Sequence, residues 1–128
     1  MVPHLSSRVA VRAARWAARL LAAGLALFWG AFFVAHLVEW YAGPRWPPAW
    51  VSGLVLLHGL IVLGLLAGWR WERLGAALTL GAAAPFFWWA AGRNFLPFLL
   101  VTAVPPALWL ACAWAEARAP GQGVPRGA

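Results

Sequence analysis

The sequence predicts an all-α membrane protein: a four-transmembrane-helix antiparallel bundle with an N-terminal basic amphipathic segment. Of its 128 residues, 64% are apolar and only 10% are charged, whereas about a quarter of the residues in soluble proteins are charged. The charges also bracket apolar runs of roughly 20 residues, the length needed to cross a hydrocarbon core of about 30 Å. These runs lack period-two alternation, so we expect helices, which satisfy their own backbone hydrogen bonds in lipid.

Residues 1–19 form the basic amphipathic segment. Its arginines recur every three or four residues and therefore share one stripe of a helix: Arg8, Arg12, Arg15 and Arg19. With Ser7 as a plausible N-cap, we expect an interfacial helix that leads into the first span. A cleaved signal peptide is disfavoured, because the following apolar run is longer than the roughly 7 to 15 residues of a signal sequence and no A-x-A site follows it.

The transmembrane domain, residues 20–116, consists of four intervals without charge. The predicted spans cover about 20–38, 48–69, 74–91 and 95–115. Short connections join them, so neighbouring spans should run antiparallel. The tail, residues 117–128, has no periodicity and is expected to be disordered.

Small residues and prolines within the spans predict local packing. Stripes at four-residue spacing suggest close helix contacts at Ala22/Ala26/Gly30, Gly64/Gly68 and Ala77/Gly81. Prolines that remove backbone donors should kink the third and fourth helices, at Pro85 and at Pro105 and Pro106.

The arginines also predict the orientation. Eight lie on the side of the two termini, against only Arg45 and Arg93 on the other. The positive-inside rule then places a multi-pass protein in the inner (plasma) membrane with both termini in the cytoplasm, and the tryptophans cluster near the span ends as an interfacial belt requires. The pI near 11.8 does not indicate nucleic acid, since the arginines flank apolar spans. The expected partners are the lipid bilayer and another membrane protein or a second copy of the chain.

Polar groups at membrane depth are costly and therefore candidates for function. The candidate cluster comprises His36, Glu39, His58 and Arg93. His36 and Glu39 lie three residues apart on one helix face, where they could relay a proton or orient a ligand. In the favoured structural alternative, His36 hydrogen-bonds within the bundle, Glu39 pairs with Arg93 or Arg45, and His58 is a buried interhelical donor.

Two histidines on adjacent helices also raise the possibility of haem. At about 1.5 Å per residue, His36 should lie roughly 4 to 5 Å inside the outer boundary and His58 roughly 15 Å. One iron cannot bind both imidazoles across an offset of about 10 Å, so haem is disfavoured. The pair also lacks the further ligands of a zinc or copper site. We expect no cofactor and no metal.

An enzyme is also disfavoured. No nucleophile with a neighbouring base and no glycine-rich phosphate loop are present. The lone Cys112 excludes an intrachain disulfide and a CxxC mechanism, and is expected to be a small buried side chain.

Apolar motifs across roughly residues 25–115 resemble a family of uncharacterised bacterial four-helix integral membrane proteins, a domain of unknown function. The motifs are FWGAFFVAHLVEW, PPAWV, LLHGLIVLGLLAGWRWERLG and the FF pair after Pro85. The resemblance implies a fold but no activity. The favoured function is a non-enzymatic accessory or interaction subunit. The alternative is small-molecule or ion/proton transport that uses His36 and Glu39 at the outer mouth of the bundle, and a haem-bearing redox subunit ranks third.

Overall fold

The computed structural model describes the backbone of residues 3–118 and the side chains of residues 7–118. The chain forms four α-helices and one short 3-10 helix: α1 Pro3–Tyr41, α2 Ala49–Ala67, α3 Glu72–Ala90, η1 Gly92–Asn94 and α4 Phe95–Arg118. The predicted all-α fold with four packed helices is confirmed. The predicted disordered tail lies almost wholly outside the described residues.

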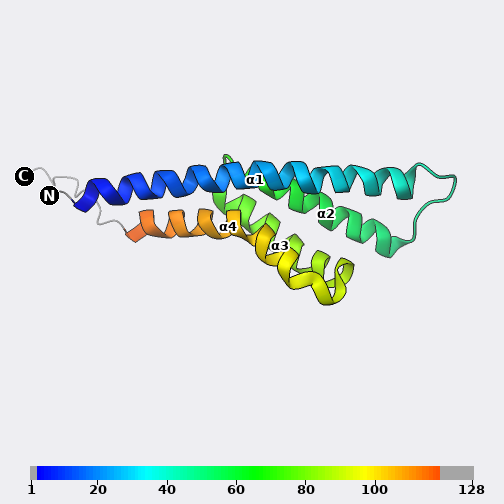
Figure 1. The fold of residues 1–128 in the computed structure, drawn as a ribbon. Helices are drawn as coiled ribbons and strands as arrows, with labels where there is room; N and C mark the ends of the chain where they lie inside the picture. Colours follow the sequence, from blue (N-terminus) through cyan, green and yellow to red (C-terminus); the bar gives the residue numbers. More distant parts are fainter. Residues whose placement is uncertain (1–2, 119–128) are drawn as a thin grey trace, which may run out of the picture.

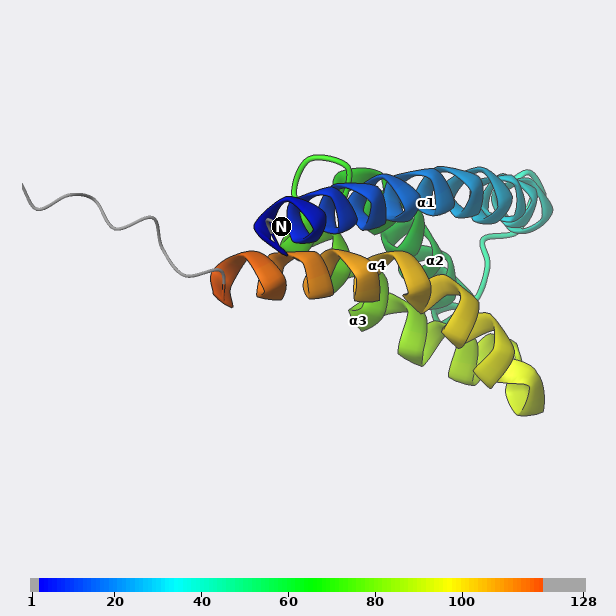
Figure 2. The same cartoon turned by 60° about the vertical axis from the view of Figure 1, so that its left-hand side comes forward.

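The helices form a closed ring in sequence order. Each helix packs against its neighbour along the chain, and α4 returns to pack against α1. Figures 1 and 2 show α1 as the longest element, with the later turns of α4 running beside its first half. Figure 1 also shows α4 bending between its early and later turns. Prolines inside α3 and α4, the cause expected for such bends, are Pro85, Pro105 and Pro106.

Helix α1 is continuous from the arginine stripe to the end of the first apolar run. Its 39 residues extend about 58 Å at 1.5 Å per residue, far more than the hydrocarbon thickness of about 30 Å. The amphipathic segment is therefore helical but forms the first turns of α1 rather than a separate element. Its position at the membrane interface stays a prediction.

Three helical segments of the described chain are long and apolar enough to cross a membrane: Ser7–Tyr41, Ala49–Ala67 and Gly92–Arg118. Helix α3 does not belong to this group, because Glu72 and Arg73 begin it and it also contains glycine, threonine, proline and tryptophan. It packs against α2 and α4 but keeps an exposed apolar face that includes Leu74, Trp88 and Trp89. Its crossing of the membrane stays a prediction.

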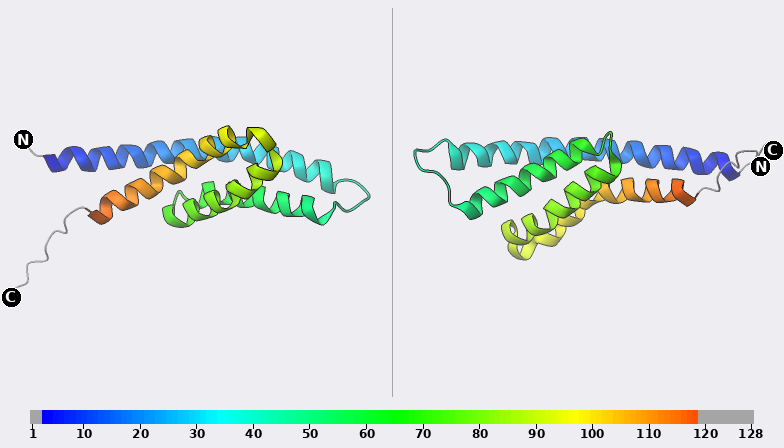
Figure 3. Two further views of the ribbon diagram at one scale, coloured as in Figure 1. Left: turned by 90° about the horizontal axis from the view of Figure 1, so that it is seen from below. Right: turned by 180° about the vertical axis from the view of Figure 1, so that it is seen from behind.

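The bundle has two dissimilar ends. The end that contains the start of α1, the 68–71 turn and the end of α4 is called the arginine-rich end. The opposite end, which contains the 42–48 loop and η1, is called the histidine end. Figure 3 shows the α3–α4 hairpin diverging from α1 toward the histidine end.

Small residues produce the closest helix contacts, near the 68–71 turn. A Cβ atom on Gly75 would lie 2.3 Å from the Cα of Gly68, and a Cβ on Gly68 would lie 2.1 Å from the ring of Trp109. The predicted contact face at Gly64/Gly68 is therefore confirmed. The stripe at Ala77/Gly81 is wrong: both residues are exposed, because α3 turns its Gly75, Ala76 and Thr79 side inward instead.

Candidate intramembrane histidine site

His36 of α1 and His58 of α2 face each other toward the histidine end of the bundle. Their Nδ1 atoms lie 3.3 Å apart, and their ring centroids are separated by 5.4 Å. The depth offset of about 10 Å expected from the sequence is therefore wrong. The two imidazoles lie at one level.

The stagger between α1 and α2 explains this correction. Tyr41 is the last residue of α1, and its hydroxyl donates a hydrogen bond of 2.8 Å to the hydroxyl of Ser52. The last turn of α1 is thus level with Ser52, and the first residues of α2 extend about 6 Å beyond it. From this level His36 and His58 are five and six residues away, which brings their side chains together.

His58 is buried among aromatic rings, with only 1% of its surface exposed. Its ring centroid lies 4.8 Å from that of Phe86, 5.6 Å from Phe33 and 6.0 Å from Trp29. Within the part of the chain that the structure describes, its Nε2 atom makes no hydrogen bond. His36 is half-buried. The pair therefore has an outer, accessible member and an inner, enclosed one.

The contact between the two histidines is compatible with two tautomers. A neutral imidazole has one N–H donor and one acceptor nitrogen. If Nδ1 of His58 donates to Nδ1 of His36, the inner Nε2 is left as an unpaired lone pair. If Nδ1 of His36 donates instead, Nε2 of His58 carries the N–H. The 3.3 Å contact fits either arrangement, and Nε2 of His58 is an acceptor only in the first.

Two cavities adjoin the histidine pair. One, of about 150 Å³, lies between α1, α2 and α3 and includes Trp40, Trp50 and Leu54 in its lining. The other, of about 280 Å³, lies between α1, α3 and α4, where the hairpin diverges from α1. Both cavities are lined by His36, His58 and Phe86. The two imidazoles thus border two apolar spaces.

The larger cavity has a rigid aromatic wall. The indole nitrogen of Trp29 donates a hydrogen bond of 3.1 Å to the hydroxyl of Thr102, which ties α1 to α4. The ring of Phe87 lies 5.1 Å from Trp29 and stacks on Phe98 at 6.0 Å. Trp29 and Phe87 are buried. The wall of the cavity is therefore fixed by hydrogen bonding and ring packing.

The structure does not bring Glu39 and Arg93 into this site. Both are exposed, Glu39 on the last turns of α1 and Arg93 in η1. Within residues 3–118, Glu39 forms no ion pair with Arg45 or Arg93, although the sequence suggested one. Nor does it hydrogen-bond His36, whose side-chain partner there is His58. Of the four candidate residues, the structure joins only the two histidines.

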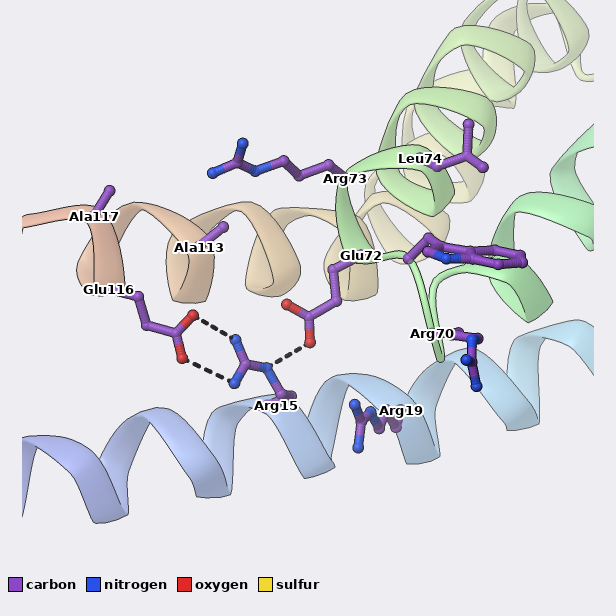
Figure 4. Close-up of a pocket in the computed structure, with 10 residues that line it drawn as sticks. Arg15, Arg19, Arg70, Glu72, Arg73, Leu74, Ala113, Glu116 and Ala117 are labelled. Atoms are coloured by element: carbon purple, nitrogen blue, oxygen red, sulfur yellow. Dashed lines mark hydrogen bonds and ion pairs between the residues drawn. The ribbon is translucent and has the colours of Figure 1, made fainter.

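At the arginine-rich end, an ion-pair cluster joins three helices. Arg15 of α1 bonds both carboxylate oxygens of Glu116 in α4 at 3.0 Å, and its Nε lies 2.5 Å from Glu72 of α3 (Figure 4). These contacts lie outside the charge-free spans. They raise the pKa of Arg15 above its ordinary value, and Arg15 lowers the pKa of Glu116.

This cluster was not anticipated from the sequence. Its one signal is that two of the three acids, Glu72 and Glu116, lie at the same predicted membrane face as the arginine stripe. Which arginine they contact depends on how α1 is rotated.

The histidine pair is a poor fit for haem or for a closed metal site. Within the described residues, no group of three or more His, Cys, Asp or Glu side chains could hold a metal ion. A porphyrin between the imidazoles would have to separate α1 from α2. These helices pack closely there, because a Cβ on Gly59 would lie 3.2 Å from the Phe33 ring. Two aligned imidazoles are thus not enough for haem.

No known protein family, curated protein or solved structure matches this chain. The comparisons therefore support no family, and the resemblance to uncharacterised bacterial membrane proteins stays without support from them. The structure itself shows a four-helix, largely apolar protein with three helices able to span a membrane.

Proposed function

We propose that this small multi-pass membrane protein is a non-enzymatic receptor for a lipophilic ring compound with a hydroxyl or N–H donor. The observation that carries the proposal is the buried His58, whose Nε2 has no hydrogen-bond partner among the described residues and whose side chain lines two apolar cavities. Ligand sites are typically apolar pockets with a few convergent polar groups. The proposal takes the tautomer in which His58 carries its proton on Nδ1, so that Nε2 is an acceptor and the ligand donates.

Access from the bilayer supports a lipophilic ligand. Side chains that line the larger cavity are also partly open to the surroundings: Phe28 is 50% exposed, Phe32 47% and Phe98 43%. In a membrane these rings face lipid. A ligand dissolved in the bilayer could pass between α1 and the α3–α4 hairpin without crossing water.

In this proposal each histidine has a distinct role. His58 accepts the ligand's hydrogen bond at Nε2, while its Nδ1–H bond to His36 keeps the ring in that tautomer. The aromatic side chains Trp29, Phe86 and Phe87 enclose the ring of the ligand. The structure gives Glu39 no part in binding, so it is not included.

The test uses para-tert-butylphenol as the probe and its methyl ether, para-tert-butylanisole, as the matched control. We expect the phenol to shift the ¹⁵N resonances of His58 saturably in histidine-labelled protein in nanodiscs, while the ether, which has no donor, leaves them unchanged. His58→Gln should abolish phenol binding, and His4→Gln should preserve it. Equal responses to phenol and ether would overturn the proposal.

The second candidate is an accessory subunit, as the sequence favoured. The observation in its favour is the divergence of the α3–α4 hairpin from α1, with exposed apolar rings on both α1 and α4 toward the histidine end. Since the rings Phe28, Phe32 and Phe98 present no charge, the matching occupant is one apolar transmembrane helix of a partner. Stoichiometric co-purification of such a partner in mild detergent, lost on Phe32→Glu, would favour this role. A preparation that contains this chain alone, with the phenol bound, would favour the receptor.

We further propose that the arginine-rich end faces the cytoplasm of the plasma membrane, because eight arginines mark that side of the chain against two. Reporter fusions at both termini should then be active only as cytoplasmic reporters. Activity of periplasmic reporters at either terminus would contradict the orientation.

A further inference from the structure

A third cavity, separate from the two at the histidine site, lies at the arginine-rich end. It has a volume of about 750 Å³ and is formed by α1, the 68–71 turn, the start of α3 and the end of α4 (Figure 4). Four arginines and two glutamates line it, so its charged side chains have a net charge of +2. A cavity of this size and charge at the end of the apolar spans can hold a large anionic group.

The arginines of this cavity differ in their availability. Arg15 is already paired with Glu72 and Glu116. Within residues 3–118, no ion pair involves Arg19, Arg70 or Arg73, which come from α1, the turn and α3. The Nε of Arg19 is buried without a hydrogen-bond partner. The guanidinium groups of Arg19 and Arg70 are therefore available to a ligand, whereas Figure 4 shows the Arg73 side chain directed away from them.

Aromatic and apolar side chains surround the charges. The guanidinium group of Arg19 lies 5.5 Å from the Trp16 ring, and that of Arg70 lies 6.0 Å from Trp71. Trp71 is 58% exposed and Leu74 is 49% exposed, and both line the cavity. The cavity therefore offers positive charges next to an exposed apolar surface. These match the anionic headgroup and the acyl chains of a phospholipid at the membrane interface.

We propose that this cavity binds the phosphate-containing headgroup of an anionic phospholipid, with acyl chains lying along Trp71 and Leu74. Basic pockets between transmembrane helices are known sites for such headgroups, and guanidinium groups match phosphate oxygens in bidentate geometry. The exposed apolar surface favours a lipid over free phosphate. The Arg15 cluster positions the three helices around the site but does not bind the ligand.

The experiment measures quenching of tryptophan fluorescence by lipids with brominated acyl chains in phosphatidylcholine nanodiscs. Brominated phosphatidylglycerol should quench more than an equal amount of brominated phosphatidylcholine, and the excess measures the preference for the anionic headgroup. The variant R19Q/R70Q should weaken this preference about fivefold for each arginine removed. The matched control, R45Q/R93Q, removes the same charge at the histidine end and should retain it.

Four results would overturn the proposal. Equal quenching by the two lipids would show that the site does not select the headgroup. An equal loss in R45Q/R93Q would show a general effect of net charge. Displacement of the excess quenching by inorganic phosphate would identify a site for free phosphate. The variant R19K/R70K keeps both positive charges, so it should fold and retain most of the preference for phosphatidylglycerol. A folded R19K/R70K variant without this preference would also contradict the proposal.

Discussion

The two ends of the bundle are packed by different kinds of side chain. Near the 68–71 turn, glycines and alanines bring backbones together, as at Gly68 and Gly75, and the Arg15 cluster joins three helices. Toward the histidine end, rings such as Trp29, Phe86 and Phe87 separate the helices and leave cavities between them. Small residues give close contacts between backbones, whereas large rings fill space less completely.

This difference assigns separate roles to the two halves. The glycine contacts near the turn fix α2 and α3 relative to one another, because nothing can be inserted between Gly68 and Gly75 without displacing backbone. The aromatic half instead leaves apolar space between its helices, bordered by the two histidines. Substitutions can test whether stability and binding are separated in this way.

The largest effect is expected for Gly75→Ala. The added Cβ would meet the backbone of Gly68 at 2.3 Å, and backbone cannot move aside as a side chain can. Separation of α2 and α3 should lower the free energy of unfolding by about 3 kcal/mol, measured by denaturation in mild detergent. Gly81→Ala is the matched control, since its Cβ meets nothing within 4 Å. An equally stable Gly75→Ala variant would refute the close packing.

A smaller effect is expected for Arg15→Gln. Loss of the guanidinium group leaves Glu72 and Glu116 without their shared partner, and hydrogen bonds to charged groups contribute about 2 kcal/mol. Thermal unfolding should show the loss. The control is Arg12→Gln on the same stripe, where the described chain shows no ion pair. If both variants unfold alike, the cluster does not join the helices.

Acidification should weaken the same cluster. The pKa of Glu116 is lowered in the folded protein, chiefly by its hydrogen bonds to Arg15. The ion pair therefore contributes stability at pH values above the ordinary pKa of glutamate, and this stability is lost as the pH falls through the lowered folded value. The stability difference between the wild type and Arg15→Gln should shrink at acidic pH. A constant difference would contradict the assignment.

The smallest effect is expected for Thr102→Val, toward the histidine end. It leaves the indole N–H of Trp29 unpaired in the bundle, at a cost of about 1 kcal/mol. Thr79→Val is the matched control, because the buried hydroxyl of Thr79 has no partner among the described residues, and its loss should be neutral or stabilising. Denaturation of both variants side by side provides the measurement. If Thr79→Val lowered the free energy of unfolding more than Thr102→Val, the hydrogen bond between Trp29 and Thr102 would not be the stabilising one.

The sequence was sufficient to predict the helices but not their relative positions. Charges such as Arg70 and Glu116 delimit apolar runs directly, since transfer of a charge into hydrocarbon is costly wherever it occurs along the chain. Hydropathy alone could not decide whether α3 crosses the membrane, because Glu72, Arg73 and its glycines and tryptophans offset the leucines, alanines and phenylalanines of the same helix.

The histidine contact could not be predicted in the same way. Its depth depends on how far α2 extends past Tyr41, and the 42–48 loop that sets this stagger has no hydropathy signal. The ion pairs of Arg15 depend on the rotation of α1 about its axis, which is fixed by packing against α2 and α4. Both are properties of the assembled bundle, so pattern analysis of single helices missed them.

The uninterrupted length of α1 makes membrane thickness a variable in this protein. The helix is unbroken between Arg19 and His36, so the backbones of these two residues are about 25 Å apart along the helix axis. If Arg19 binds the phosphates of one leaflet, as the predicted orientation implies, the length of α1 also sets the depth of His36 in the bilayer. Thinner bilayers would bring water nearer to His36, and thicker ones would withdraw it, so short-chain and long-chain lipids should give different rates of proton exchange at this imidazole.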